Sequence, residues 1–193
     1  TMTNLNNRLN FSGGPGVLPE SVLQQLQQAI IEVPGTGLSV LGISHRSDWF
    51  AGLVEQTERD LRALLDLPDS HALLLLQGGA TLQFSMIPML LLRGSGRAAE
   101  YLRTGYWSAK SIPPARLEGE VRVIWNGERQ GGGFRRLPTA DELACSPEAA
   151  YLHYVSNETV EGVQFQHVPG LDGVSRVCDM SSDFLSRPFD PER

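Results

Sequence analysis

Residues 73–84 read Leu-Leu-Leu-Leu-Gln-Gly-Gly-Ala-Thr-Leu-Gln-Phe. The apolar run Leu73–Leu76 predicts a short buried strand, the two glycines predict a turn, and residues 82–92 predict a helix that begins at the turn. N–H groups at the start of a helix have no partner within it, and the helix dipole favours negative charge there. Thr81 adds a hydroxyl donor, so this stretch is a candidate phosphate cradle.

The turn lacks two motifs of nucleotide-binding sites, and this restricts the class of phosphate ligand that it could bind. The Gly-x-Gly-x-x-Gly fingerprint of dinucleotide sites is absent, and no Gly-Lys-Ser/Thr follows as in a Walker loop. The single lysine of the chain, Lys110, lies far downstream. A small phosphorylated ligand or cofactor, held by backbone and hydroxyl groups, remains. Gly-Gly between a strand and a helix is often only a tight connection, and that plainer interpretation holds unless other residues converge on the turn.

Composition and charge restrict the possible partners. The net charge of −6 argues against a nucleic-acid surface, and the longest apolar runs, 72–76 and 86–92, are too short to cross a bilayer. Cys145 and Cys178 lack metal-ligand spacing and are interpreted as reduced thiols of a cytoplasmic protein. The four histidines are scattered. We therefore expect no nucleic acid, no membrane and no metal.

The pattern along the chain predicts an α/β fold. A glycine- and proline-rich entry segment, residues 1–18, precedes the rest. Helices are predicted at 19–33, 47–67 and 82–92, and strands at 73–76, 98–102, 121–125, 151–155 and 174–178. Strands that alternate with helices indicate a mostly parallel sheet with helices on both faces.

Four candidate residues follow predicted strand ends, where ligands bind in such folds. They are Thr81, Trp107, Thr159 and Asp179. A carboxylate at the end of a buried strand needs a cationic or donor partner, and a pyridinium nitrogen is such a partner. An anion site, an aromatic ring for stacking and an Asp that keeps a ring nitrogen protonated are what pyridoxal 5′-phosphate requires.

Six motifs resemble a known family, the phosphoserine aminotransferases, which are class V aminotransferases of fold type I. The motifs are Asn10-Phe-Ser-Gly-Gly-Pro, Ser44-His-Arg, Gln77-Gly-Gly-Ala-Thr-Leu-Gln-Phe, Gly105-Tyr-Trp, Ser156-Asn-Glu-Thr-Val-Glu-Gly and Asp179-Met-Ser-Ser-Asp-Phe-Leu-Ser-Arg-Pro. They occur in the family's order and cover the chain from about the first predicted helix to its last residue. The resemblance implies the large domain of a pyridoxal-phosphate enzyme.

The resemblance also implies roles at the cofactor. Ala80 and Thr81 would donate to its phosphate, and Trp107 would stack on its pyridine ring. Thr159 would hydrogen-bond near its 3′ oxygen, and Asp179 would pair with its ring nitrogen. Plainer interpretations exist: Asp179 could be the N-cap of a following helix, and Thr159 could be a turn hydroxyl.

For substrate, the resemblance implies binding by His45 and Arg46, with Arg46 holding a carboxylate. These two residues could otherwise be a solvated pair. The implied reaction is transamination between L-glutamate and 3-phosphohydroxypyruvate, which gives 2-oxoglutarate and O-phospho-L-serine. It belongs to serine biosynthesis and, in many bacteria, to pyridoxine biosynthesis. The family also implies a homodimer.

One departure from the family affects the activity expected of this chain. The family's Schiff-base lysine lies shortly beyond Ser186-Arg187-Pro188, and this chain ends before it. We therefore expect residues 19–193 to be a large domain truncated before that lysine and before the small C-terminal domain, and inactive alone. A second departure is Thr81, because some members carry arginine in the glycine turn. Alternatives are another class V enzyme, such as an alanine–glyoxylate type aminotransferase, or a non-catalytic ligand-binding fragment.

Overall fold

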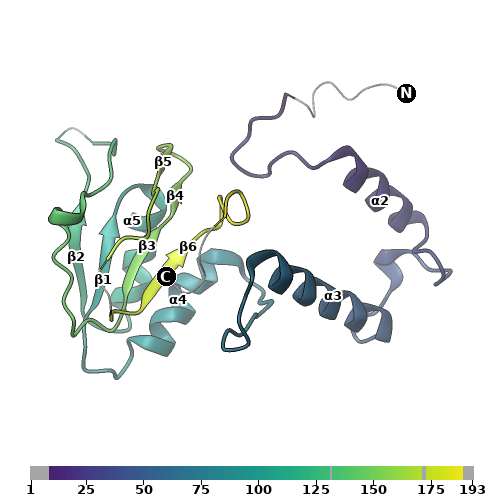
Figure 1. The fold of residues 1–193 in the computed structure, drawn as a ribbon, viewed down its shortest axis with the longest axis horizontal. Coiled ribbons are helices and arrows are strands. Elements are labelled where there is room, and N and C mark those ends of the chain that lie inside the picture. The colour runs from purple at the N-terminus through teal and green to yellow at the C-terminus, as the bar shows by residue number, and fades with distance from the viewer. Residues whose placement is uncertain (1–8, 131, 171–172, 189–193) are drawn as a thin grey trace. The chain divides into compact units, whose positions relative to one another are not determined.

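The computed structural model describes residues 9–130, 132–170 and 173–188 (Figure 1). These residues form two compact units, which divide between Leu74 and Leu75. We call the first, up to Leu74, the helical unit. We call the second, Leu75–Pro188, the sheet unit.

The helical unit contains two of the predicted helices. Helix α2 spans Glu20–Ile31 and follows Pro19, a residue whose fixed φ suits a helix start. Helix α3 spans Asp48–Leu65, and the hydroxyl of its N-cap Ser47 accepts a hydrogen bond from the Phe50 N–H at 3.3 Å. A short 3-10 helix, η1, lies between them at Val40–Gly42. Both predictions are confirmed, but neither α2 nor α3 buries a residue.

The sheet unit is built on four parallel strands in the order β2-β1-β3-β6 (Figure 1). The strands are β1 (Ala99–Arg103), β2 (Val121–Asn126), β3 (Leu152–Val155) and β6 (Arg176–Asp179). A small antiparallel hairpin of β4 (Asn157–Glu158) and β5 (Val163–Gln164) follows β3 directly. The predicted α/β architecture with a mostly parallel sheet is confirmed.

The strand predicted at Leu73–Leu76 is wrong. These residues have no regular structure, and Leu74, Leu75 and Leu76 are 71%, 57% and 54% exposed. A strand needs a neighbour to complete its ladder of hydrogen bonds, and no strand among the described residues pairs with this segment. The apolar run indicated a preference for burial but not the partner that would provide it.

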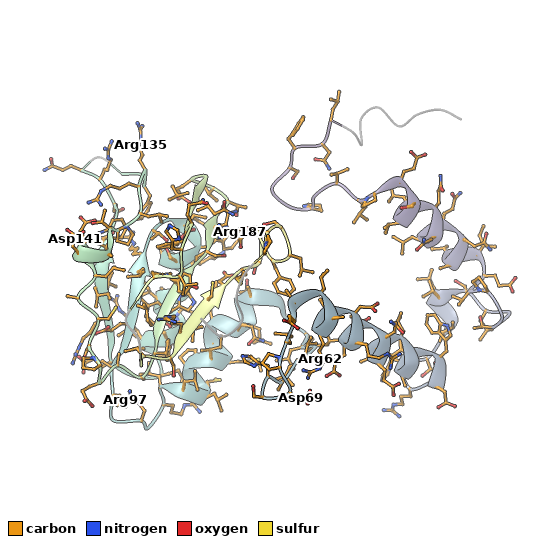
Figure 2. The ribbon with its side chains drawn as sticks, viewed as in Figure 1. Arg62, Asp69, Arg97, Arg135, Asp141 and Arg187 are labelled. Atoms are coloured by element: carbon orange, nitrogen blue, oxygen red, sulfur yellow. The ribbon has the colours of Figure 1, made fainter. Side chains whose placement is uncertain are left out.

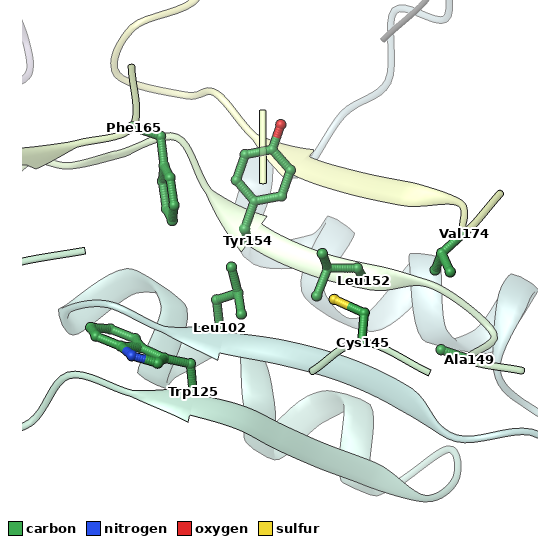
Figure 3. Packing of buried hydrophobic residues seen from close by; sticks show 8 residues of the cluster. All are labelled: Leu102, Trp125, Cys145, Ala149, Leu152, Tyr154, Phe165 and Val174. Atoms are coloured by element: carbon green, nitrogen blue, oxygen red, sulfur yellow. The ribbon is translucent and has the colours of Figure 1, made fainter. Parts of the chain in front are cut away.

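Helices α4 (Gly79–Leu91) and α5 (Tyr106–Arg116) pack against one face of the sheet. That side of the core consists of Leu92, Ala99, Tyr101, Ile112, Ala115 and Tyr151. The opposite face is covered by the connection between β2 and β3, which includes the 3-10 helix η2 (Ala140–Glu142), and by residues that precede β6 (Figure 3). Its core consists of Leu102, Trp125, Cys145, Ala149, Leu152, Tyr154, Phe165 and Val174.

Candidate functional site

The carboxyl ends of β1, β3 and β6 lie at one edge of the sheet, because all three strands are parallel. Each strand leads into a candidate segment. Trp107 follows β1, Thr159 follows β3 through the hairpin, and Asp179 is the last residue of β6. The sequence prediction that the candidate residues follow strand ends is confirmed for these three, but it is wrong for Thr81, which follows no strand among the described residues.

Trp107 and Thr159 are in direct contact, although 52 positions separate them. The indole Nε1 of Trp107 donates to Oγ1 of Thr159 at 2.9 Å. Trp107 is half-buried and Thr159 is exposed, so the pair lies at the surface of the sheet edge. Because Thr159 accepts from the indole, its own hydroxyl hydrogen is left to donate to another group. The amine of Lys110 lies 5.4 Å from the centroid of the Trp107 ring, and Lys110 is exposed as predicted.

In the first turn of α5, which carries Trp107, the backbone N–H groups donate hydrogen bonds to two carboxylates. The N–H of Tyr106 donates to Glu161 at 3.0 Å. The N–H groups of Trp107 and Ser108 donate to the two oxygens of Glu158 at 2.9 and 3.0 Å. Sequence reasoning missed both acids. The signal was present in Ser156-Asn-Glu-Thr-Val-Glu-Gly, where a glutamate stands beside the predicted cofactor threonine.

In the first turn of α4, by contrast, the backbone N–H groups meet no carboxylate among the described residues. Its N-cap, Gly78, has φ 94°, and a Cβ there would lie 2.4 Å from the side chain of Leu82, so the turn requires glycine. In the part of the chain that the structure describes, the N–H groups of Gly79, Ala80 and Thr81 have no hydrogen-bond partner. The helix begins at Gly79, three residues before its predicted start, so Ala80 and Thr81 lie within its first turn.

Asp179 is half-buried and holds a turn. Its Oδ1 accepts from the N–H and the hydroxyl of Ser181 at 3.0 and 2.6 Å. Its Oδ2 has no hydrogen bond within the described residues. The chain after Asp179 turns rather than forming a helix, so the alternative interpretation of Asp179 as a helix N-cap is wrong.

The loop after Asp179 is fixed by a buried acid. Asp183 accepts from Ser156 at 2.5 Å and from Gln164 at 3.1 Å. Arg187, labelled in Figure 2, donates to the same carboxylate at 3.3 Å and to the carbonyl oxygen of Phe165. These bonds tie the loop to the hairpin and to the end of β3, so Asp179 is supported from both sides.

His153 of β3 lies on the face of the sheet that α4 covers. Its ring stacks on Tyr101 with centroids 4.7 Å apart and meets Phe84 of α4 edge-on at 6.1 Å. Burial lowers the pKa of His153 to about 4, and the charge of Asp179 opposes that shift only in part. Its Nδ1 has no partner among the described residues. Nothing in the sequence indicated that one of the four scattered histidines would be buried between the sheet and α4.

His45 and Arg46 belong to the helical unit. Both are exposed, and the Arg46 N–H donates to the hydroxyl of Ser44 at 3.1 Å. The two units are described separately, so the substrate role of these residues stays a prediction.

The described residues contain neither a metal-binding cluster nor a membrane-spanning helix. No group of three or more His, Cys, Asp or Glu side chains is arranged to hold a metal ion. Within 9–130, 132–170 and 173–188, no helix is both long enough and apolar enough to span a bilayer.

Comparison with known proteins identifies the family. The model for "Aminotransferase class-V" matches residues 8–193. The chain belongs to the class-V aminotransferases. A curated member, phosphoserine aminotransferase of Laribacter hongkongensis, is 50% identical over 184 residues, which are 95% of this chain and 50% of that relative.

Two solved class-V aminotransferases share the fold. Phosphoserine aminotransferase from Bacillus circulans subsp. alkalophilus aligns with a TM-score of 0.87 and 39% identity over 95% of this chain. Pyridoxal-phosphate-bound phosphoserine aminotransferase from Trichomonas vaginalis aligns with a TM-score of 0.84 and 32% identity over 94% of this chain. Each alignment covers 50% of the solved chain, so this chain spans about half the length of the relatives it matches.

Proposed function

We propose that this chain provides the pyridoxal-phosphate-binding large domain, residues 19–193, of a phosphoserine aminotransferase, preceded by the entry segment 1–18. The reaction is transamination between L-glutamate and 3-phosphohydroxypyruvate. The observation that carries the proposal is the 2.9 Å hydrogen bond between Trp107 and Thr159 at the edge of the sheet where β6 presents Asp179.

The side chains at this edge, together with the backbone N–H groups at the start of α4, match the cofactor's parts one by one. The free N–H groups of Ala80 and Thr81 suit a phosphate, and the Trp107 indole offers a face for a pyridine ring. Thr159 retains a hydroxyl hydrogen for the 3′ oxygen, and Oδ2 of Asp179 is available for a protonated ring nitrogen. When bound, that ring serves as the electron sink for transamination.

The substrate assignment rests on the relatives. Two curated relatives that are matched over 95% of this chain are named phosphoserine aminotransferases, and Arg46 offers a planar guanidinium that suits a substrate carboxylate. We assign His45 and Arg46 to substrate binding. The catalytic lysine of the family is assigned to the other half of the relatives' length. Lys110 is exposed and its amine lies over aromatic rings, so the 193-residue chain alone has no aminotransferase activity.

Self-association is the expected state of the protein. Helices α2 and α3 bury no residue, yet both carry exposed apolar side chains, among them Leu26, Ile30 and Leu53. Such a surface favours contact with a second copy, which supports a homodimer. Sedimentation at micromolar concentration gives a species heavier than 21.1 kDa if this holds, and a clean monomer would contradict it.

Cofactor binding is tested by titration with pyridoxine 5′-phosphate, which has the ring and phosphate but no aldehyde to react with Lys110. Binding quenches part of the tryptophan emission, and Trp107→Ala removes that part while Trp49 and Trp125 still report folding. The substitution weakens binding by about 1–3 kcal/mol, the range for stacking of a ring base on an aromatic side chain. Equal quenching in both proteins would contradict the assignment.

Substrate choice is tested in a chimera that joins this chain to the remaining half of the L. hongkongensis relative. We expect turnover of L-glutamate with 3-phosphohydroxypyruvate and little with glyoxylate. Preference for glyoxylate would instead favour the alanine–glyoxylate type. The unfused chain is the control, and turnover by it would show that the catalytic amine has been misplaced.

A further inference from the structure

Glu158 is a fully buried acid whose carboxylate makes three hydrogen bonds. Its relative exposure is 0%. Besides the N–H groups of Trp107 and Ser108, the hydroxyl of Thr104 donates to it at 3.1 Å. Among the described residues it forms no ion pair, so these donors and the positive end of the α5 dipole compensate its burial.

The bonds of Glu158 hold Trp107 at its backbone, while the next residue holds it at its side chain. Glu158 Oε2 accepts from the Trp107 N–H, and Thr159 Oγ1 accepts from the Trp107 indole, each at 2.9 Å. The adjacent residues Glu158 and Thr159 therefore hold Trp107 by hydrogen bonds to its backbone and to its ring. The first point fixes where the helix starts, and the second fixes the direction of the ring.

The chain around Trp107 is shaped to admit this carboxylate. A Cβ on Gly105 would lie 2.6 Å from Cδ of Glu158, so any side chain at the N-cap of α5 would displace the acid. Ser108 adds support, because its hydroxyl accepts from the N–H groups of Thr104 and Gly105 at 2.8 and 2.9 Å. The whole entry to α5 is built around Glu158.

We infer that Glu158 is a positioning residue for the cofactor ring. It does not touch the ring itself; it sets the Trp107 indole and the Thr159 hydroxyl in the relative placement that a bound pyridine ring needs. The inference rests on the proposed function, because it assigns Glu158 to the site proposed there. Glu161, whose only hydrogen-bond partner among the described residues is the Tyr106 N–H of the same helix turn, has no such effect.

The test is a double-mutant cycle read by equilibrium dialysis with pyridoxine 5′-phosphate. Glu158→Gln places an amide donor against one of the backbone donors, so we expect the dissociation constant to rise about tenfold, the size of one lost charge-assisted hydrogen bond. In the Trp107→Ala background, which has no ring for Glu158 to position, the same change raises it less than about twofold. Glu161→Gln is the matched control and leaves the constant unchanged.

A spectroscopic measurement follows the same effect without ligand. In protein labelled with ¹⁵N-tryptophan, Glu158→Gln shifts the indole N–H resonance of Trp107 and leaves those of Trp49 and Trp125 in place. If Glu158→Gln does not fold, Thr104→Val removes only the hydroxyl that donates to Glu158, and a smaller shift of the same resonance is expected.

The outcomes separate the two proposals. If wild type does not retain pyridoxine 5′-phosphate, the proposed function fails and this inference fails with it. If wild type binds and Glu158→Gln binds equally well, only the inference is overturned. An equal loss of affinity in the wild-type and Trp107→Ala backgrounds would also overturn it, because Glu158 would then act through general stability.

Discussion

Helices α4 and α5 pack on the same face of one sheet, yet their N-termini differ. The first-turn N–H groups of α5 are occupied by Glu158 and Glu161, whereas those of α4 have no partner among the described residues. Both ends carry the same partial positive charge. The charge at the start of α5 is compensated by Glu158 and Glu161, whereas the start of α4 is free to bind an external anion. We therefore assign the start of α4 to the cofactor phosphate.

The largest effect is expected when α4 is made to resemble α5. Thr81→Asp places a carboxylate in the first turn of α4, where it stabilises the helix but repels a phosphate. At about 4 Å and an effective dielectric near 20 the repulsion is ~4 kcal/mol, so affinity for pyridoxine 5′-phosphate falls by about 100-fold or more. Thr81→Asn, of similar shape and uncharged, is the dialysis control. Equal losses in both variants would show that charge is not the cause.

The reverse change disturbs the closed end of α5. Gly105→Ala adds a Cβ within 2.6 Å of both Glu158 and Glu161, so it drives the buried Glu158 carboxylate and the half-buried Glu161 carboxylate away from their donors. We expect the free energy of unfolding to fall by about 2–4 kcal/mol. Urea unfolding followed by tryptophan emission measures it. Gly52→Ala in α3, where nothing lies within 4 Å of the added atom, is the control and should not destabilise.

Stability should fall at acid pH because His153, which packs against α4, becomes protonated. His153 contacts Phe84 of α4, and its pKa is about 4 in the folded protein against 6.5 ordinarily. The unfolded chain therefore binds a proton first, so this contribution to stability is complete above pH 6.5 and is lost as the pH falls toward 4. The loss reaches about 3 kcal/mol. His153→Gln should flatten the pH profile of urea unfolding between these values, and an unchanged slope would contradict the assignment.

The smallest effect is expected at the second acid of α5. Glu161→Gln keeps an oxygen for the Tyr106 N–H, and it replaces an oxygen, Oε2, that has no partner among the described residues. The free energy of unfolding should change by less than about 1 kcal/mol. A loss as large as that of Gly105→Ala would mean that the two acids act as one unit.

The local parts of the fold were predictable because they depend on neighbouring residues. Ser47 as an N-cap, the glycine turn at 78–79 and the apolar strands at 99–103 and 152–155 are all short-range patterns. The run Leu73–Leu76 failed because a strand depends on a partner elsewhere in the chain, and hydrophobicity names no partner.

The places of the candidate site residues in the fold were predictable, but the hydrogen bonds between them and their neighbours were not. Trp107 and Asp179 could be assigned to one sheet edge because parallel strands end together there. That Glu158 holds the backbone of Trp107 could not be read from the sequence, since 51 positions separate the two residues and neither has a spacing signature. The resemblance supplied roles for the residues expected to face the cofactor and none for Glu158.

The parallel sheet also has a consequence for the speed of folding. Each neighbouring pair in the order β2-β1-β3-β6 is joined by a crossover rather than a hairpin, so no ladder can form until a long loop has closed. The grip of Glu158 on α5 joins the strand after β3 to the helix after β1, so it depends on one of those closures. In stopped-flow refolding, Trp107 should therefore reach its native emission late, with the final β1–β3 pairing rather than with the early formation of helix.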